Sequence, residues 1–158
     1  ARPREAWLAM LYHDAVYEPG RRDNEARSAA LAASAITRWL PHEGLDVAHV
    51  VGLIELTARH GALSPDELGP GPDGDDRRNF LDCDMAILGA APDAFDAYDR
   101  AIAEEYRGVV PDWLYRLNRR RFLRGLLRRE LIYLGDFFNA RLDAAARGNL
   151  RRALGVEP

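Results

Sequence analysis

Apolar residues recur along this chain at the three- and four-residue spacing of amphipathic helices. The clearest case follows Asp46, which precedes four apolar residues that share one helical face: Val47, Val50, Val51 and Ile54. Alternation of apolar and polar residues, as in half-buried strands, is essentially missing, and no internal repeat is evident. The pattern therefore predicts an all-α fold.

Prolines, glycines and capping residues predict where the helices begin and end. The expected helices cover about 3–17, 23–40, 47–60, 77–88 and 92–106, and two more begin near 111 and 136. In the last helix we expect Phe138, Leu142 and Ala145 to point inward. The segment 61–76 is rich in proline, glycine and acid, so we expect a long surface loop there, with one capped turn at 64–67.

Composition fits one soluble domain. The chain has 158 residues, of which 47% are hydrophobic and 30% charged, and no apolar stretch approaches the length of about 20 residues that crosses a bilayer. Its single cysteine, Cys83, excludes an intramolecular disulfide and fits a reducing cytoplasm. We expect Cys83 to be a small buried packing residue.

Charge adds two expectations. A net charge of -3 argues against a dedicated nucleic-acid binder, so a nucleic-acid partner is not expected. All 22 basic residues are arginines, and six of them crowd one predicted helix: Arg119, Arg120, Arg121, Arg124, Arg128 and Arg129. Most should form a solvated face paired with the acids of 61–76. Arg120 and Arg124 are candidates for binding a substrate phosphate, because arginine binds phosphate bidentately.

A histidine and an aspartate, His13 and Asp14, stand inside the apolar run of the first predicted helix. Burying an unpaired carboxylate there would cost several kcal/mol, so something must compensate Asp14. A divalent metal would do so, because imidazole and carboxylate are both metal ligands. Two structural alternatives stay open: a core histidine bonded to a backbone carbonyl, and an aspartate paired with an arginine.

The pair resembles the signature of the HD-domain superfamily of metal-dependent phosphohydrolases. Other motifs resemble one bacterial branch of it, known mostly as predicted phosphohydrolases. They are H-D-A-V-Y at 13–17, D-N-E at 23–25 with Ser28, D-C-D-M-A-I-L-G at 82–89, and a carboxy-terminal pattern that includes Pro111-Asp112, Leu123-Arg124-Gly125 and Ala146-Arg147-Gly148-Asn149-Leu150. The resemblance is nearly chain-wide and implies a single compact helical HD domain.

The resemblance also implies three metal ligands, His13, Asp14 and Asp84. Residues two apart on a helix diverge by about 200°, so Asp82 and Asp84 cannot both face one ion. The superfamily pattern puts the ligand on Asp84 and leaves Asp82 as a supporting or capping group.

Three further residues are candidates for the site. In HD phosphohydrolases an acid just after the His-Asp pair often orients the attacking water, a role that falls to Glu25, although Glu25 can equally be a first-turn acid that favours the helix. Asp23 is a supporting group or an N-cap. His60 either points into the site toward substrate phosphate or is an imidazole favoured by the dipole of a helix C-terminus.

The expected activity is hydrolysis of a small phosphate ester or nucleotide by a metal-activated water, with a divalent ion of Mn, Fe, Co, Ni, Zn or Mg. A non-catalytic ligand-binding or regulatory module is the alternative. It is favoured because the superfamily's first metal-binding histidine, upstream of the pair, is absent from these residues. We therefore expect that the chain lacks its N-terminal helix or helices, which would leave Trp7 and Met10 poorly covered.

Overall fold

The computed structural model describes residues 2–59 and 61–156. It divides into two compact units, Ala1–Leu81 and Asp82–Pro158, each taken by itself below. The described residues form helices and connecting turns, with no β-strand among them, which confirms the all-α prediction. None of the described helices is long and apolar enough to cross a membrane.

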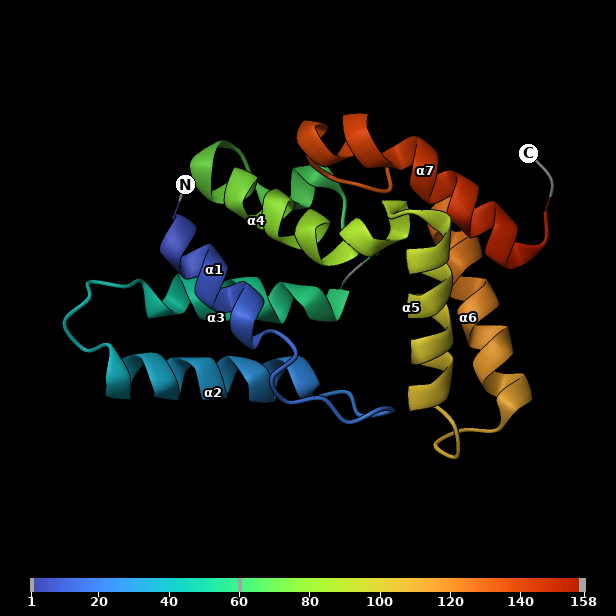
Figure 1. Ribbon diagram of the computed structural model, residues 1–158. Helices are drawn as coiled ribbons and strands as arrows, with labels where there is room; N and C mark the ends of the chain where they lie inside the picture. The colour runs from blue at the N-terminus through green and yellow to red at the C-terminus, as the bar shows by residue number, and fades with distance from the viewer. Residues whose placement is uncertain (1, 60, 157–158) are drawn as a thin grey trace. The chain divides into compact units, whose positions relative to one another are not determined.

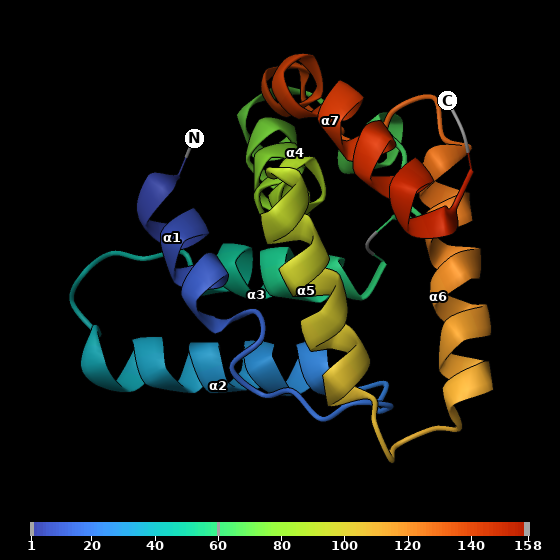
Figure 2. The same cartoon turned by 45° about the vertical axis from the view of Figure 1, so that its right-hand side comes forward.

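The first unit is built on an antiparallel pair of helices, α2 (Asn24–Trp39) and α3 (Val47–Leu56), with α1 (Pro3–Tyr12) packed against both (Figures 1 and 2). The Asp46 side chain accepts a hydrogen bond from the backbone N–H of His49, so the predicted start of α3 is confirmed. The apolar core of this unit consists of Ala9, Ala29, Ala32, Ile36, Val50, Leu53, Ile54, Leu63, Leu68, Phe80 and Leu81.

The first helix is shorter than predicted. It ends at Tyr12 rather than near residue 17, and the residues from His13 to Val16 form turns. The cause lies in α2, because the Ser28 hydroxyl accepts a hydrogen bond from the Val16 N–H at 3.0 Å and bonds the Val16 carbonyl at 3.2 Å. These bonds hold the Val16 backbone in the bend that follows the helix.

The expected loop at 61–76 is largely helical, which corrects the prediction. A 3-10 turn, η2 (Pro65–Leu68), carries the expected capping box of Ser64 and Glu67. Helix α4 then begins at residue 71 and runs over Gly71–Asp84. Gly74 permits this early start, because a Cβ atom there would collide with the Gly69 carbonyl.

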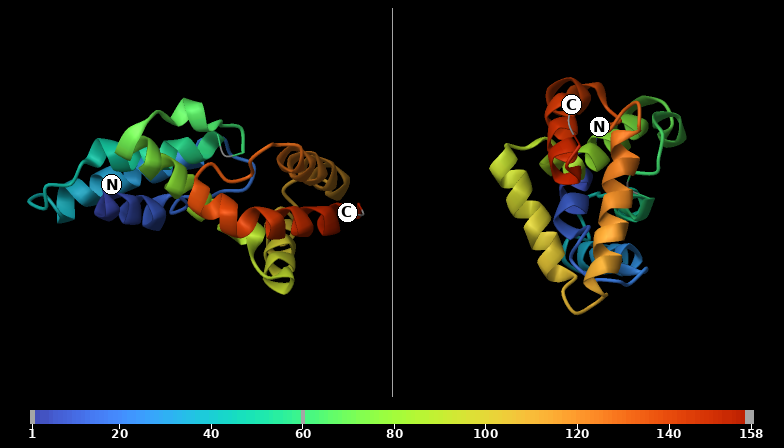
Figure 3. Two further views of the ribbon diagram at one scale, coloured as in Figure 1. Left: turned by 90° about the horizontal axis from the view of Figure 1, so that it is seen from above. Right: turned by 90° about the vertical axis from the view of Figure 1, so that its right-hand side faces the viewer.

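The second unit contains a 3-10 helix, η3 (Met85–Gly89), and the helices α5 (Pro92–Glu105), α6 (Asp112–Leu127) and α7 (Asp136–Leu154). From the loop that joins them, α5 and α6 diverge (Figure 3, right). The buried core of this unit is Met85, Leu88, Phe95, Leu123, Leu126, Ile132, Tyr133, Ala146, Leu150 and Leu154. Phe138 and Leu142 pack against it as predicted, but Ala145 is exposed and its neighbour Ala146 is buried instead.

Polar side chains tie α7 to the rest of this unit. The Asn149 amide donates hydrogen bonds to the carbonyls of Leu88 at 2.8 Å and Ala90 at 2.9 Å. Arg147 donates to the carbonyl of Leu127, the last residue of α6. Helix carbonyls in the last turn have no partner inside the helix, so these bonds satisfy groups that burial would otherwise penalise.

Candidate metal site at His13 and Asp14

His13 is the C-cap of α1, with its backbone N–H bonded to the carbonyl of Ala9. Its ring Nδ1 lies 2.8 Å from the Met10 carbonyl oxygen, and the ring meets Phe80 edge-on at 6.2 Å between centroids. Because a carbonyl can only accept, Nδ1 carries a proton. In the neutral imidazole the lone pair is therefore on Nε2, which is the tautomer that metal-binding histidines commonly adopt.

Asp14 lies beside this lone pair, with its Oδ2 atom 3.3 Å from Nε2 of His13. The Asp14 side chain is 68% exposed, whereas that of His13 is 16% exposed. The expectation that Asp14 is buried in an apolar helix is therefore wrong, because α1 ends before it. A lone pair beside a carboxylate is unfavourable unless a proton or a metal ion lies between them, so the pair is compatible with a protonated histidine as well as with a metal ion.

The spacing of the two donors fits a shared ion. A first-row metal lies about 2.0–2.2 Å from imidazole nitrogen and carboxylate oxygen, which puts neighbouring donors about 3.0–3.4 Å apart. The observed 3.3 Å falls in that range. Within the described residues, however, no group of three or more His, Cys, Asp or Glu side chains is placed to hold a metal. The geometry thus supplies two ligands.

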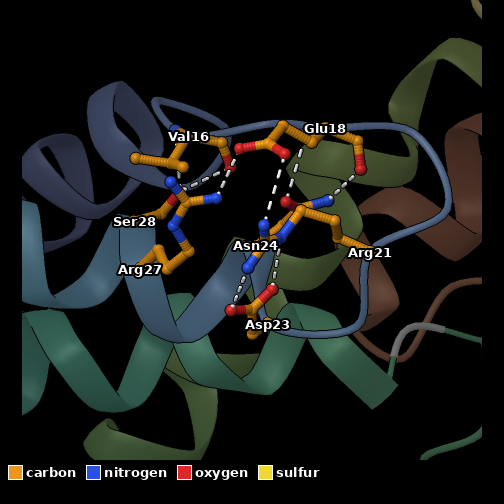
Figure 4. Close-up of polar contacts among 7 residues, drawn as sticks. All are labelled: Val16, Glu18, Arg21, Asp23, Asn24, Arg27 and Ser28. Carbon is orange, nitrogen blue, oxygen red and sulfur yellow. Dashed lines mark hydrogen bonds and ion pairs between the residues drawn. The ribbon is translucent and has the colours of Figure 1, made fainter.

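The turn that carries this pair is fastened to the start of α2 (Figure 4). The Asn24 amide donates to the carbonyl of Glu18 at 3.0 Å and accepts from its N–H at 3.1 Å. Ser28 makes the corresponding two bonds to Val16. Both side chains are buried. Asn24 and Ser28 belong to the D-N-E and Ser28 motif. The sequence did not reveal their role, because each side chain hydrogen-bonds to backbone several residues away.

Asp23 stands at the N-cap position of α2, but its side chain does not cap the helix. It binds the Arg21 guanidinium with both oxygens, at 2.8 and 2.7 Å, and these bonds lower the pKa of Asp23 (Figure 4). Arg27 bonds Glu18 at 2.6 Å on the same surface. Asp23 therefore stabilises the turn between α1 and α2.

Replacing Ser28 by alanine is expected to lower the free energy of unfolding by about 1–3 kcal/mol, because the partly buried N–H and carbonyl of Val16 lose their partner. Urea unfolding followed by circular dichroism measures this change. The matched control is Ser34→Ala, at an exposed position of the same helix, which should change stability by less than about 0.5 kcal/mol. Equal effects of the two substitutions would contradict this role of Ser28.

The structure says less about the two predicted catalytic residues, Glu25 and His60, than about His13 and Asp14. Glu25 is half-buried in the first turn of α2, and its carboxylate makes no hydrogen bond or ion pair with the part of the chain that the structure describes. His60 lies outside the described residues. Their roles as catalytic groups stay predictions.

Asp82 and Asp84 belong to the second unit and differ as the helical geometry predicts. Asp82 is 1% exposed and accepts hydrogen bonds from the backbone N–H groups of Leu134 and Gly135, both at 2.7 Å. Asp84, the last residue of α4, is half-buried. Cys83 between them is exposed, so its expected burial is wrong. Desolvation by its surroundings and the two flanking carboxylates raise the pKa of its thiol, which disfavours the reactive thiolate.

The predicted substrate-binding arginines lie on α6. Arg120 donates to the carbonyl of Leu154 at 3.1 Å and so caps α7, whereas Arg124 is exposed. The expected pairing of this helix with the acids of 61–76 stays a prediction. Within their own unit, most of those acids bind other groups. The contacts are Glu67 with Arg59, Asp73 with Arg2, Asp75 with Arg78, and Asp76 with the Arg2 N–H and His49.

Comparisons of the chain with protein-family models, with curated proteins and with solved structures found no match. Membership of the HD superfamily therefore stays a prediction from the motifs.

Proposed function

We propose that this protein is a metal-dependent phosphohydrolase that acts on a small phosphate ester or nucleotide. The observation that supports the proposal is the pair of donors Nε2 of His13 and Oδ2 of Asp14, 3.3 Å apart on a turn that α2 holds in place. The resemblance to HD phosphohydrolases supplies the reaction class.

His13 and Asp14 would hold the ion, and the Met10 carbonyl keeps the imidazole in the required tautomer. When bound, a divalent ion would polarise a phosphoryl oxygen and lower the pKa of its bound water to about 7. Glu25 accepts a hydrogen bond from the attacking water and orients it. Asp84 stays a ligand predicted by the resemblance alone.

The test is a hydrolysis screen over nucleotides and sugar phosphates, with the chelated protein reloaded in turn with Mn²⁺, Fe²⁺, Co²⁺, Ni²⁺, Zn²⁺ and Mg²⁺. We expect hydrolysis that is lost in Asp14→Ala and kept in Asp66→Ala, a control at an exposed acid of the same unit. Asp84→Ala tests the other predicted ligand separately. Binding has its own readout, because Co²⁺ coordinated by His13 should show visible absorption that His13→Ala weakens. Intact substrates with every metal would refute the proposal.

A binding or regulatory module is the second candidate, because the described residues bring together only two donor side chains, fewer than catalytic sites use. In that case nucleotides bind with unchanged affinity after chelation, as isothermal titration calorimetry would show. Binding that requires the metal would favour the enzyme instead.

A further inference from the structure

One face of α6 points away from the core of its unit. Leu123 and Leu126 form the buried side of the helix. The opposite side is a line of exposed residues, called here the outer face: Trp113, Leu117, Arg121, Arg124 and Arg128, the last being the C-cap. Side chains three or four residues apart lie on one face of a helix, so these residues form a continuous stripe. It starts beside the loop from which α5 and α6 diverge (Figure 3, right).

Positive charge on the outer face is not neutralised within the described part of the second unit. Arg121, Arg124 and Arg128 are exposed and make no ion pair with any described residue of that unit. Asp112 is the only acid in α6, and Arg119, on the inner side, takes the carboxylate of Asp99 at 2.7 Å. The stripe is thus strongly basic, although the net charge of the chain is -3. Such a local concentration attracts polyanions independently of net charge.

The stripe also carries an exposed aromatic ring. Trp113 is 67% exposed and Leu117 is 50% exposed, at the end of the stripe that precedes the arginines. A helix that lies in a membrane surface needs an apolar face along its length, and the arginines occupy that line over the rest of α6. A polyanion that also carries flat apolar groups would complement both the arginines and the exposed Trp113 of the stripe. Single-stranded nucleic acid has this chemistry, because its unpaired bases can stack on an aromatic ring while its phosphates bind arginine.

We propose that the outer face of α6 binds single-stranded nucleic acid, with Arg121, Arg124 and Arg128 on consecutive phosphates and Trp113 stacked on an unpaired base. Four helical residues rise about 6 Å, so the arginines follow a flexible strand along the helix. This binding goes beyond the proposed hydrolysis and does not depend on it. The net charge of -3 argued against a nucleic-acid partner because it sums over the whole chain, whereas the charge of this face is local.

Fluorescence anisotropy of a labelled twelve-nucleotide oligothymidylate, titrated with the full chain, tests the proposal. We expect Arg121→Gln/Arg124→Gln/Arg128→Gln to weaken binding at least tenfold. The slope of log K against log salt should become shallower by about 2, since each phosphate contact contributes about 0.7 for single strands. The control Arg22→Gln/Arg38→Gln/Arg100→Gln removes equal charge at exposed positions elsewhere and should leave both quantities nearly unchanged.

A second variant separates stacking from charge. Trp113→Leu should remove the quenching of tryptophan fluorescence on binding and weaken binding several-fold, with the salt slope unchanged. The proposal would be overturned by equal loss in the two triple variants, by no loss in Trp113→Leu, or by binding of anionic phosphatidylserine vesicles but not of the oligonucleotide. Competition by polyglutamate as effective as that by unlabelled oligonucleotide would overturn it as well.

Discussion

Asp82→Ala is expected to lower the free energy of unfolding of the second unit by roughly 2–5 kcal/mol. The carboxylate is buried and accepts from the N–H groups of Leu134 and Gly135, which immediately precede α7. Alanine leaves both partly buried donors without an acceptor, and each donor left without a partner costs about 1–3 kcal/mol. The loss should also free the chain that leads into α7.

Chemical unfolding in urea measures this effect, and Asp84→Ala is the matched control. Asp84 is half-buried and lies two residues further along the same helix, so its removal should cost less than about 1 kcal/mol. The pair separates stability from catalysis, because Asp84→Ala should affect hydrolysis and Asp82→Ala should affect folding. Similar unfolding midpoints for the two variants would show that the Asp82 hydrogen bonds contribute little.

Gly89→Ala is expected to destabilise the second unit by about 1–3 kcal/mol or more. A Cβ atom at Gly89 would lie 2.7 Å from the Cβ of Leu142 and 3.0 Å from the Tyr133 hydroxyl. Neither neighbour can move freely, since Tyr133 is fully buried and its hydroxyl donates to the Met85 carbonyl at 3.3 Å. Overpacking of a filled core has a cost of this size.

The control for Gly89 is Gly148→Ala, inside α7, where an added Cβ meets nothing within 4 Å. That substitution should raise the free energy of unfolding by about 0.5–1 kcal/mol, because alanine favours the helix more than glycine does. Thermal unfolding should therefore move in opposite directions for the two variants. Stabilisation by both would mean that η3 and α7 are not packed as closely as the structure has them.

Helical periodicity was enough to predict the all-α class and most helices, because apolar residues at a spacing of three and four form one face of a helix and not of a strand. The two boundaries that were predicted wrongly depend on contacts with groups outside the helix itself. Helix α1 ends early because Ser28 bonds Val16, and α4 begins early because Gly74 lets the Gly69 carbonyl approach. The glycine- and proline-rich composition of 61–76 indicated a loop, yet proline and acid also suit the first turn of a helix.

The candidate site was only partly accessible from the sequence. The His13 and Asp14 pair was visible as a motif, and its spacing is compatible with an ion. The exposure of Asp14 was not visible in the sequence, because it depends on where α1 ends. Asn24 and Ser28 were visible as members of a motif, but their bonds to the backbone of Glu18 and Val16 were not, because such a bond has no signature in the local sequence.

The bonds from Asn149 have a consequence for the order in which the chain folds during synthesis. They join the carbonyls of Leu88 and Ala90 to a residue about 60 positions later. The core contacts of η3 with α7 therefore cannot form until α7 has left the ribosome, whereas the helices up to Leu81 can pack as soon as they emerge. Until then Met85 and Leu88 expose apolar surface. We therefore expect aggregation and chaperone binding to be strongest while the second unit is only partly synthesised.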